Sequence, residues 1–392
     1  MKILYYSPHP HLSMHAPTGY GTHMREMIAS WRRMGIEVYT CIAGDVAGEE
    51  YRSQETVKGG RFSSVKRVIP RVLWESMRDV SLIRFDRSQE RVLAEQIKKV
   101  QPDVIYERVA YLQNSGIKMA RKYGIRHVSE INAPYPQERI SFSGKSFFVS
   151  AARNIEREIL VRSDGISVVS SALKQYLVNI LPEAESKITV VPNAVNPIDI
   201  DFSEEKIAEL KHSYGLGKEL VVGFVGSMFP YHGVDILIKA FAKIPDELQV
   251  RLLIVGDGAI LHELKSLARA QGVFQRVIFT GSVPHREVYE NIHIMDICCM
   301  PKSNWYGSPV KIFEYALMRK PVIAPNEVPM HDVMGPDDGE LVEPDVDDFY
   351  HALMKLIENE DRRNLIANNW HEKVMQEYTW DEAAQKTLTL CT

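Results

Sequence analysis

The stretch LVVGFVGSMFPYHGVDILIKAF, residues 220–241, carries the clearest structural signal in the chain. It begins with an apolar run at 220–225 and continues through a loop bounded by Gly226 and Gly233. Apolar side chains then recur at the spacing of one helix face, at Val234, Leu237, Ile238 and Phe241. A buried strand that leads through a glycine loop into an amphipathic helix is the repeating unit of a parallel sheet covered by helices.

The same alternation extends along the chain in two series. Before residue 200, the candidate strands are 2–7, 37–42, 103–107, 127–131, 165–170 and 188–191. After it, the candidates are 220–226, 250–256, 276–281, 296–300 and 321–324. Residues 192–205 hold two prolines and show no clear periodicity, which indicates a linker. The pattern predicts two doubly wound α/β domains, with ligands at the carboxyl ends of the strands and an active site in the cleft between the domains.

The composition is that of an ordinary globular protein and excludes a disordered or fibrous one. The 392 residues are 45% apolar and 25% charged, with a formal net charge of −4. Residues 1–200 hold 28 Lys/Arg and 21 Asp/Glu, whereas residues 201–392 hold 19 and 30. The acidic second half argues against nucleic-acid binding.

The cysteines and the apolar runs predict where the protein works. Four cysteines without a C-x-x-C pair form neither a disulfide framework nor a zinc site, which favours a reducing compartment. The N-terminal apolar run is too short for a signal peptide, and no run approaches the roughly 18 residues of a membrane span. We expect a cytoplasmic protein, and attachment to a membrane surface stays open.

Residues 61–87, RFSSVKRVIPRVLWESMRDVSLIRFDR, interrupt the regular pattern. They hold seven Lys/Arg against three acids, mixed with Phe62, Trp74 and Phe85. One interpretation is a solvated helical hairpin. The other is a surface for an anionic acceptor or an anionic lipid, with peripheral contact at the inner face of a membrane.

A loop after the first candidate strand leads to PTGYGTH at 17–23, which opens a helix. Gly19, Tyr20 and Gly21 would let the backbone approach an acceptor or a phosphate at the helix N-terminus, where free N–H groups favour anions. The dinucleotide fingerprint G-x-G-x-x-G fails because Met24 occupies the third glycine position. This failure makes a nicotinamide-dependent dehydrogenase an unfavoured interpretation.

Four histidines lie in or beside this loop: His9, His11, His15 and His23. Metal ions are usually bound with carboxylate or cysteine ligands as well, and none is near in the sequence. Contacts within the loop or to substrate are therefore the favoured interpretation, and we expect no metal site.

Three later segments repeat the layout of strand, loop and helix. They are IVGDGAILHELKSLA (254–268), FTGSVPHREVYENI (279–292) and MPKSNWYGSPVKIFEYALMRKPVIAP (300–325). The ordered set resembles the retaining GT-B glycosyltransferases of family 4 over nearly the whole chain. Further resemblances are EREILVRSDGISVVSSALKQYL (158–177), VVPNAV (190–195) and YTWDEAAQKTLTL (378–390).

The resemblance implies a GT-B fold of two Rossmann-like domains with an interdomain cleft. Residues 1–200 would form an acceptor-binding domain, onto which a C-terminal helix at 378–392 packs back. Residues 201–377 would bind the nucleotide-sugar donor. Glu314 matches the second glutamate of the family's E-x7-E motif, which binds the ribose hydroxyls. A carboxylate suits that role because it accepts two hydrogen bonds.

The same resemblance implies that three loops surround the donor: one along the diphosphate, one that opens a helix toward the diphosphate or sugar, and one at the base. In that order their residues are Gly226, Ser227 and Gly233, then Ser308 and Val310, then Val283 and His285.

The chain departs from the family pattern at three positions. Tyr306 stands where the first glutamate of E-x7-E belongs, and Ser227 and His232 replace the usual Arg and Lys, which stabilise the leaving diphosphate. Lys311 lies three residues before Glu314 on one helix face and is the candidate replacement cation. The alternative for these two is an ordinary helical ion pair; contact of Lys311 with phosphate is favoured, and His232 is a second candidate contact with phosphate or sugar.

In the first half, the strand at 127–131 runs into a loop where the family often has a histidine facing the sugar. Here Asn132 lies closest to that point, preceded by Glu130. Either side chain could hydrogen-bond the donor sugar or the acceptor hydroxyl. The alternative, equally open, is that Glu130 pairs with a neighbouring Arg and Asn132 caps the loop.

The implied function is retaining, metal-independent transfer of a hexosyl unit from a UDP- or GDP-linked donor to a glycan, lipid-linked or small-molecule acceptor, as in polysaccharide biosynthesis. The donor is a co-substrate, and no further cofactor is implied. Two alternatives are a degenerate, non-catalytic GT-B protein and a nucleotide-sugar 2-epimerase of the same fold. The altered residues Tyr306, Ser227 and His232 keep the first alternative open.

Overall fold

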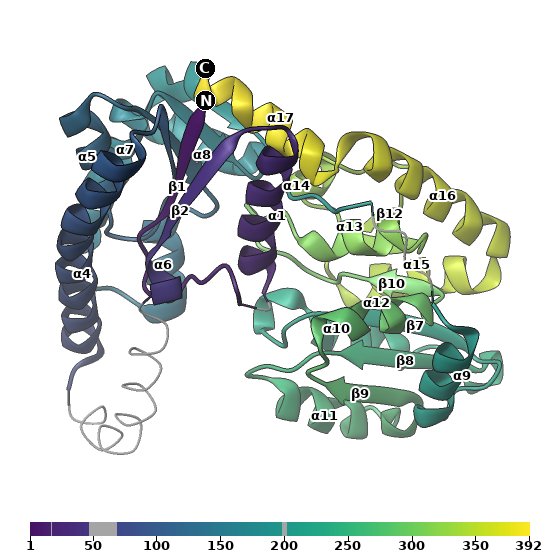
Figure 1. Ribbon diagram of the computed structural model, residues 1–392. Coiled ribbons are helices and arrows are strands. Elements are labelled where there is room, and N and C mark those ends of the chain that lie inside the picture. Colours follow the sequence, from purple (N-terminus) through teal and green to yellow (C-terminus); the bar gives the residue numbers. More distant parts are fainter. Residues whose placement is uncertain (17, 47–68, 198–201) are drawn as a thin grey trace. The chain divides into compact units, whose positions relative to one another are not determined.

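The computed structural model describes residues 1–16, 18–46, 69–197 and 202–392 (Figure 1). These residues form two compact units. The first combines Met1–Pro192 with Trp380–Thr392, and the second is Asn193–Thr379. The first unit therefore contains both ends of the chain.

The first unit is built on a six-stranded parallel sheet in the order β2-β1-β3-β4-β5-β6. Its strands are β1 (Lys2–Ser7), β2 (Glu37–Ile42), β3 (Val104–Arg108), β4 (Arg126–Ile131), β5 (Gly165–Val168) and β6 (Ile188–Val190). Its helices are α1 (Gly19–Arg33), α4 (Arg71–Val100), α5 (Ser115–Tyr123), α6 (Tyr135–Ser143), α7 (Val149–Arg162), α8 (Ser171–Ile180), the 3-10 helix η1 (Pro182–Lys187) and α17 (Trp380–Cys391).

Alternating side chains of β1 reach the two faces of this sheet. Leu4 and Tyr6 pack into a core with residues of α4 and α5. Tyr5 meets Trp31 of α1 on the other face, where the ring centroids are 6.2 Å apart. Trp31 Nε1 donates to the carbonyl of Ala384 in α17 at 3.2 Å, and α1 and α17 lie side by side (Figure 1). The C-terminal helix thus closes one face of the first sheet.

The second unit repeats the plan with the order β12-β11-β10-β7-β8-β9, again all parallel. Its strands are β7 (Leu220–Val225), β8 (Val250–Val255), β9 (Val277–Gly281), β10 (Ile297–Cys299), β11 (Val322–Pro325) and β12 (Glu340–Val342). Its α-helices are α9 (Glu204–Ser213), α10 (Val234–Phe241), α11 (Leu261–Ala270), α12 (His285–His293), α13 (Val310–Leu317), α14 (Val328–His331), α15 (Val346–Glu358) and α16 (Glu360–Glu377). Three 3-10 helices complete it: η2 (Pro230–His232), η3 (Asp246–Leu248) and η4 (Phe274–Arg276).

Both faces of the second sheet are covered by apolar cores, as its continuous apolar strands predict. Cys298 and Cys299 are adjacent in β10, and they point into different cores, one on each side of the sheet. All four cysteines are free thiols. The doubly wound α/β prediction is confirmed in both units.

Two expectations need correction. The described part of 61–87 is not a helical hairpin, because residues 71–87 lie within the single 30-residue helix α4; residues 61–68 lie outside the described part. The strand β12 was not predicted. It has three residues, all only partly buried at the edge of the sheet, so its sequence lacks the apolar run that marks the inner strands.

In each unit the strand order changes direction beside the first strand. This point lies between β1 and β3 in the first unit and between β7 and β10 in the second. Open α/β sheets bind ligands at such points, outside the carboxyl ends of the strands. The loops that follow these four strands are therefore the places to look for a site.

No helix within the described ranges is long and apolar enough to cross a membrane.

Candidate active site

The carboxyl end of β7 is shaped around the ammonium group of Lys311. Gly226 follows the strand with φ +148°, a conformation that favours glycine. A Cβ at this position would lie 2.5 Å from Lys311 Nζ. Lys311 is in the first turn of α13, and the hydroxyl of Tyr315 in the same helix accepts a hydrogen bond of 2.9 Å from the backbone N–H of Val225. Strand, glycine and helix thus fix the ammonium at the switch point of the second sheet.

The Lys311 ammonium is buried, and Nζ has no hydrogen-bond partner among the residues described. It lies 4.1 Å from the centroid of the Phe224 ring, a cation–π contact. His232 packs edge-on against the same ring at 5.9 Å, and its Nδ1 also lacks a partner within the described chain. Buried polar groups normally have hydrogen-bond partners. Lys311 Nζ and His232 Nδ1, which both lie against the Phe224 ring, therefore mark a place for a ligand rich in hydrogen-bond acceptors.

Burial shifts the pKa values of the three ionisable groups here. It lowers the pKa of Lys311 to about 7, against the opposing charge of Glu314. It raises the pKa of Glu314 to about 7, against the charge of Lys311. Burial, together with the charge of Lys311, lowers the pKa of His232 to about 3, so this imidazole is neutral at pH 7. A bound anion would reverse the shift of Lys311 by favouring its charged form.

The segment before α13 is hydrogen-bonded to Asn193, the first residue of the second unit. Asn193 donates its backbone N–H to Ser308 Oγ at 3.0 Å and its side-chain amide to the Ser308 carbonyl. The V-P-N turn and the S-P-V-K segment are therefore one structural feature. Val310, half-buried, begins α13, whose first backbone N–H groups have no side-chain cap from Pro309. Those groups are free to bind an anion.

The other residues that the sequence predicts for donor binding follow strands β7, β9 and β10 of the second sheet. Ser227 is exposed directly after Gly226, and Gly233, with φ +64°, ends the loop and is buried. Tyr306 is buried, edge-on to Trp305 at 5.2 Å. Val283 packs against the core beneath β9. His285 begins α12, and its side chain lies outside the described part.

In the first unit, Glu130 at the carboxyl end of β4 is the centre of a buried network. Arg108, the last residue of β3, forms a buried ion pair with Glu130 Oε1. Asn132 Nδ2 donates to the same oxygen at 2.7 Å, and His23 Nε2 lies 3.2 Å from it. Burial opposes charge on Glu130, but the His23 and Arg108 charges and the hydrogen bonds lower its pKa to about 2. A carboxylate held this strongly in its charged form is poorly suited to proton transfer.

This network supports the alternative in which Glu130 pairs with an arginine, while Asn132 donates to Glu130 and so completes the network. His23 connects it to the glycine loop, because it lies in the second turn of α1 and packs edge-on against Trp380 at 5.0 Å. Gly21 is required there, since a Cβ would lie 2.2 Å from the Ala16 carbonyl oxygen.

Gly19, exposed, and Tyr20, half-buried, begin α1. Thr18 caps the helix, its side chain accepting from the Gly21 N–H. Two other histidines of this loop, His9 and His11, lie beside each other with their ring centroids 5.4 Å apart. Burial lowers the pKa of His9 to about 4. In the described part of the chain, no group of three or more His, Cys, Asp or Glu side chains is arranged to hold a metal.

Sequence reasoning missed Arg108, Phe224 and Asn193. Arg108 ends an apolar strand next to Glu107, and the strand prediction stopped one residue short of it. Phe224 is a core residue whose ring face lies under Lys311 Nζ, a contact that no spacing along the sequence reveals. The V-P-N-A-V turn points to Asn193 through its resemblance to the family pattern, but the sequence does not show that Asn193 bonds to Ser308.

Two doubly wound parallel sheets, each with a reversal of strand order where a ligand can bind, fit the architecture of the GT-B class. Residues 17–198 match Glycosyltransferase Family 4, and residues 219–359 match Glycosyl transferases group 1. The chain therefore belongs to the GT-B glycosyltransferases, with a family 4 domain followed by a group 1 domain.

Individual relatives agree with this assignment. An uncharacterized glycosyltransferase of Methanocaldococcus jannaschii is 26% identical over 234 residues, 57% of this chain and 59% of that protein. A GDP-mannose-dependent alpha-(1-6)-phosphatidylinositol monomannoside mannosyltransferase of Mycobacterium tuberculosis is 28% identical over 248 residues, 60% of this chain and 63% of that protein. The match thus spans about three fifths of these curated relatives.

HepE of Anabaena, solved in complex with UDP, has the same fold. The TM-score is 0.72 at 17% identity, and the alignment covers 99% of both chains.

Proposed function

We propose that this protein is a retaining glycosyltransferase that moves a sugar from a nucleotide-diphosphate donor bound by the second unit. The observation that carries the proposal is the buried ammonium of Lys311 at the end of β7, which has no hydrogen-bond partner among the residues that the structure describes. A diphosphate would supply the acceptor oxygens that the ammonium lacks. Glu314, one helical turn further along α13, would accept hydrogen bonds from the ribose hydroxyls.

The chemistry is a displacement on one face of the sugar. The bond between the anomeric carbon and the diphosphate oxygen breaks, and the acceptor hydroxyl oxygen bonds to the same face of that carbon. The acceptor proton passes to the departing diphosphate, so no protein nucleophile is needed. Lys311 and the first N–H groups of α13 stabilise the charge that develops on the diphosphate. His232, uncharged at pH 7, adds a hydrogen bond rather than a charge.

The charge of Lys311 stands in for the family's usual Arg and Lys, replaced here by Ser227 and His232. We propose that this charge makes transfer independent of a divalent metal. We also propose that the acceptor, a glycan, a lipid-linked sugar or a small molecule, binds the first unit near Asn132 and the Gly19–Gly21 turn. The GDP-mannose dependence of the mycobacterial relative and the UDP bound to HepE support a UDP- or GDP-linked donor.

The test begins with thermal stabilisation of the purified full chain by a panel of UDP- and GDP-sugars. A ligand that binds only the native state raises the melting temperature, so the fitting donor identifies itself. Transfer or slow donor hydrolysis is then measured with that donor, with and without a chelator. The anomeric configuration of the product is read by NMR. Glu314→Ala and Lys311→Ala should each lower turnover at least a hundredfold, whereas Lys239→Ala, which removes an exposed pair with Asp235, should leave it unchanged.

Retention of configuration and insensitivity to the chelator are the expected results. Binding of a donor without any turnover would favour the non-catalytic alternative. Conversion of UDP-GlcNAc alone into its 2-epimer would favour the epimerase. Inversion of configuration would contradict the one-face displacement.

A further inference from the structure

The first half of α4 separates its charges by sign. Between residues 69 and 87 it carries four arginines, and all of them are exposed: Arg71, Arg78, Arg84 and Arg87. All three acids of the same stretch are buried: Glu75, Asp79 and Asp86. Between residues 71 and 87, therefore, only the positive charges are exposed, although the sequence itself is nearly balanced there.

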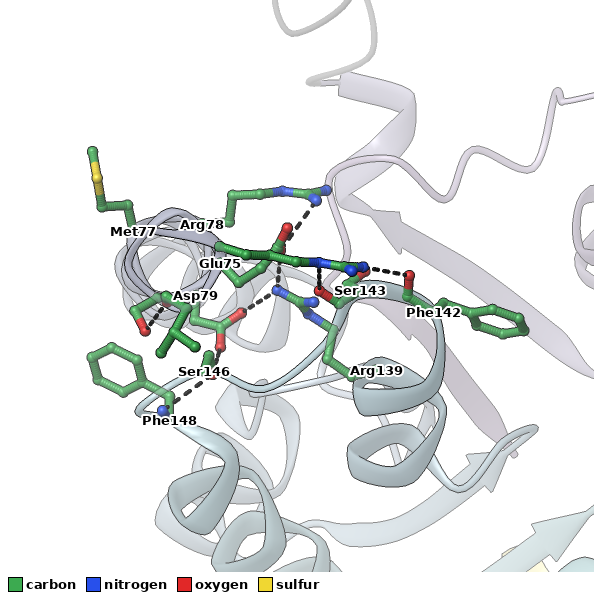
Figure 2. Close-up of polar contacts among 12 residues, drawn as sticks. Glu75, Met77, Arg78, Asp79, Arg139, Phe142, Ser143, Ser146 and Phe148 are labelled. Atoms are coloured by element: carbon green, nitrogen blue, oxygen red, sulfur yellow. Dashed lines mark hydrogen bonds and ion pairs between the residues drawn. The ribbon is translucent and has the colours of Figure 1, made fainter. Parts of the chain in front are cut away.

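The buried acids are held by specific partners (Figure 2). Arg139 of α6 bridges Glu75 at 2.6 Å and Asp79 at 3.2 Å. Tyr111 and Ser146 donate their hydroxyls to Asp79 as well. The inward direction of the acids is thus built into the fold.

Asp86 faces inward in the same way. It accepts the backbone N–H groups of Asn114 and Ser115 at 3.1 and 3.3 Å. These N–H groups belong to the start of α5, so the carboxylate caps that helix.

Large apolar side chains are also exposed in the first turns of α4 and in residues 142–147, which are hydrogen-bonded to those turns. Phe147 is 69% exposed, Met77 58% and Phe142 54%, with Leu73 and Val72 also among the exposed large apolar residues. In Figure 2, Met77 and the ring of Phe142 point away from the ion pairs of Arg139. Leu73, Met77 and Arg84 share one face of α4, being spaced by four and seven residues.

These apolar side chains are presented on a fixed scaffold. Phe147 donates its backbone N–H to Ser76 Oγ at 2.9 Å, which ties the segment after α6 to α4. Arg71 Nε donates to the Ser143 carbonyl at 3.0 Å, which ties the end of α6 to the first turn of α4. Both segments are therefore held against α4 by hydrogen bonds to their backbone.

We propose that this surface, the exposed side chains of residues 71–87 and 142–147, docks on an anionic lipid membrane. Two contributions act together: apolar side chains enter the headgroup boundary, and each exposed cation is attracted to the anionic lipid surface. The combination of arginines with large aliphatic and aromatic side chains favours a bilayer over an acidic protein or a nucleic acid, which would call for more polar contacts. The inference goes beyond the proposed transfer activity and does not depend on it.

The experiment is sedimentation of the full chain with lipid vesicles. Vesicles of phosphatidylglycerol and phosphatidylcholine in equal parts are compared with vesicles of phosphatidylcholine alone. One variant, Arg84→Glu with Arg87→Glu, reverses two cations. Its matched control, Lys98→Glu with Lys99→Glu, makes the same charge change at the opposite end of the same helix, where both lysines are exposed. A second variant, Met77→Ser with Phe147→Ser, is matched by Val92→Ser with Leu365→Ser at exposed sites elsewhere.

The wild-type protein should bind the anionic vesicles and not the neutral ones. Each surface variant should reduce the partition coefficient by about tenfold or more, and each control by less than about twofold. Equal loss in variants and controls, or no wild-type binding, would overturn the proposal. So would preference for soluble polyglutamate over vesicles, which would indicate an acidic protein partner. Stabilisation by a nucleotide sugar, measured on the same variants, should stay unchanged; if it is absent from all of them, the proposed transfer activity fails instead.

Discussion

Glu130 and Lys311 are buried charged groups at the same kind of place, the carboxyl edge of a doubly wound parallel sheet, and their surroundings are opposite. Glu130 is met by an arginine, a histidine, an amide and the hydroxyl of Tyr5. Lys311 Nζ has no hydrogen-bond partner among the described residues. The surroundings of Glu130 stabilise its charged form and lower its pKa to about 2. Those of Lys311 destabilise its charged form and lower its pKa to about 7.

This difference distinguishes Glu130, which is held by the protein itself, from Lys311, a candidate ligand-binding group. A buried charge whose partners come from the protein keeps its geometry and gains little from a ligand. A buried charge without partners costs stability until a ligand of opposite charge arrives. Both units are doubly wound sheets of six parallel strands, although their strand orders differ. The contrast therefore comes from the side chains that surround each charge.

The largest effect is expected for Glu130→Gln. It removes the carboxylate from Arg108 and leaves that guanidinium buried without a counter-charge, which should lower the free energy of unfolding by about 3–5 kcal/mol. Chemical denaturation measures the loss. Glu95→Gln, which removes an exposed helical pair with Arg91, should cost no more than about 0.5 kcal/mol.

The pH dependence provides a second reading of the same substitution. The folded-state pKa of Glu130 lies below its unfolded value of 4.5, so its contribution is present above that value and is lost as the pH falls toward 2. The wild-type protein should lose stability across this window more steeply than Glu130→Gln. Parallel pH profiles would mean that the network around Glu130 contributes nothing to folding.

Lys311→Met should have the next largest effect, on activity and in the opposite sense on stability. If Lys311 stabilises the leaving diphosphate as we propose, loss of its charge should cost about 2.7–4 kcal/mol of activation free energy, or roughly 10²–10³ in kcat. The same change removes an unsatisfied buried ammonium, so the unfolding free energy without ligand should rise by about 1 kcal/mol. Turnover assays and denaturation measure the two effects. A variant that is both less stable and fully active would mean that Lys311 serves folding.

The contrast also shows what sequence reasoning reaches. Eleven of the strands follow from apolar-rich runs of four to seven residues separated by helical patterns, and their predicted ends differ from the observed ones by two residues at most. β12 escaped because three half-buried residues at a sheet edge carry no such run. The hairpin expected within 61–87 was wrong because its acids are spaced to face inward along one continuous helix, and their partners lie far along the chain.

The candidate sites were predictable only in part, for the same reason. Residues in a loop after a strand, such as Gly226, or at the start of the helix that follows one, such as Lys311, can be placed from the sequence at the carboxyl edge of a sheet. Whether a charge there has partners depends on contacts across the sheet. Arg108 meets Glu130 because β3 and β4 are neighbours, with Arg108 opposite Glu130 in the register. No spacing along the chain contains that information.

Glu156 of α7 sharpens the comparison with the smallest expected effect, because it is an incompletely satisfied acid inside the first unit. Its Oε1 has no partner in the described chain, its other oxygen accepts from Tyr176 at 3.3 Å, and it lines a cavity of about 20 Å³ with Tyr111 and Ile159. Burial raises the pKa of Glu156 to about 7, against the hydrogen bond from Tyr176 and the charge of Arg153.

The sign of the pH effect is therefore the reverse of that for Glu130. The folded protein holds an extra proton on Glu156 between its unfolded pKa of 4.5 and about 7, so stability falls as the pH rises through this window. Glu156→Gln should match the wild type at pH 5 and exceed its unfolding free energy by about 1–2 kcal/mol at pH 8. Glu158→Gln, in the same helix but paired with Arg162 near the surface, should show no such gain. If Glu156→Gln is less stable than the wild type at pH 8, the Glu156 carboxylate has a partner in solution. A buried polar atom without a partner among the described residues would then not be enough to identify Lys311 as part of a binding site.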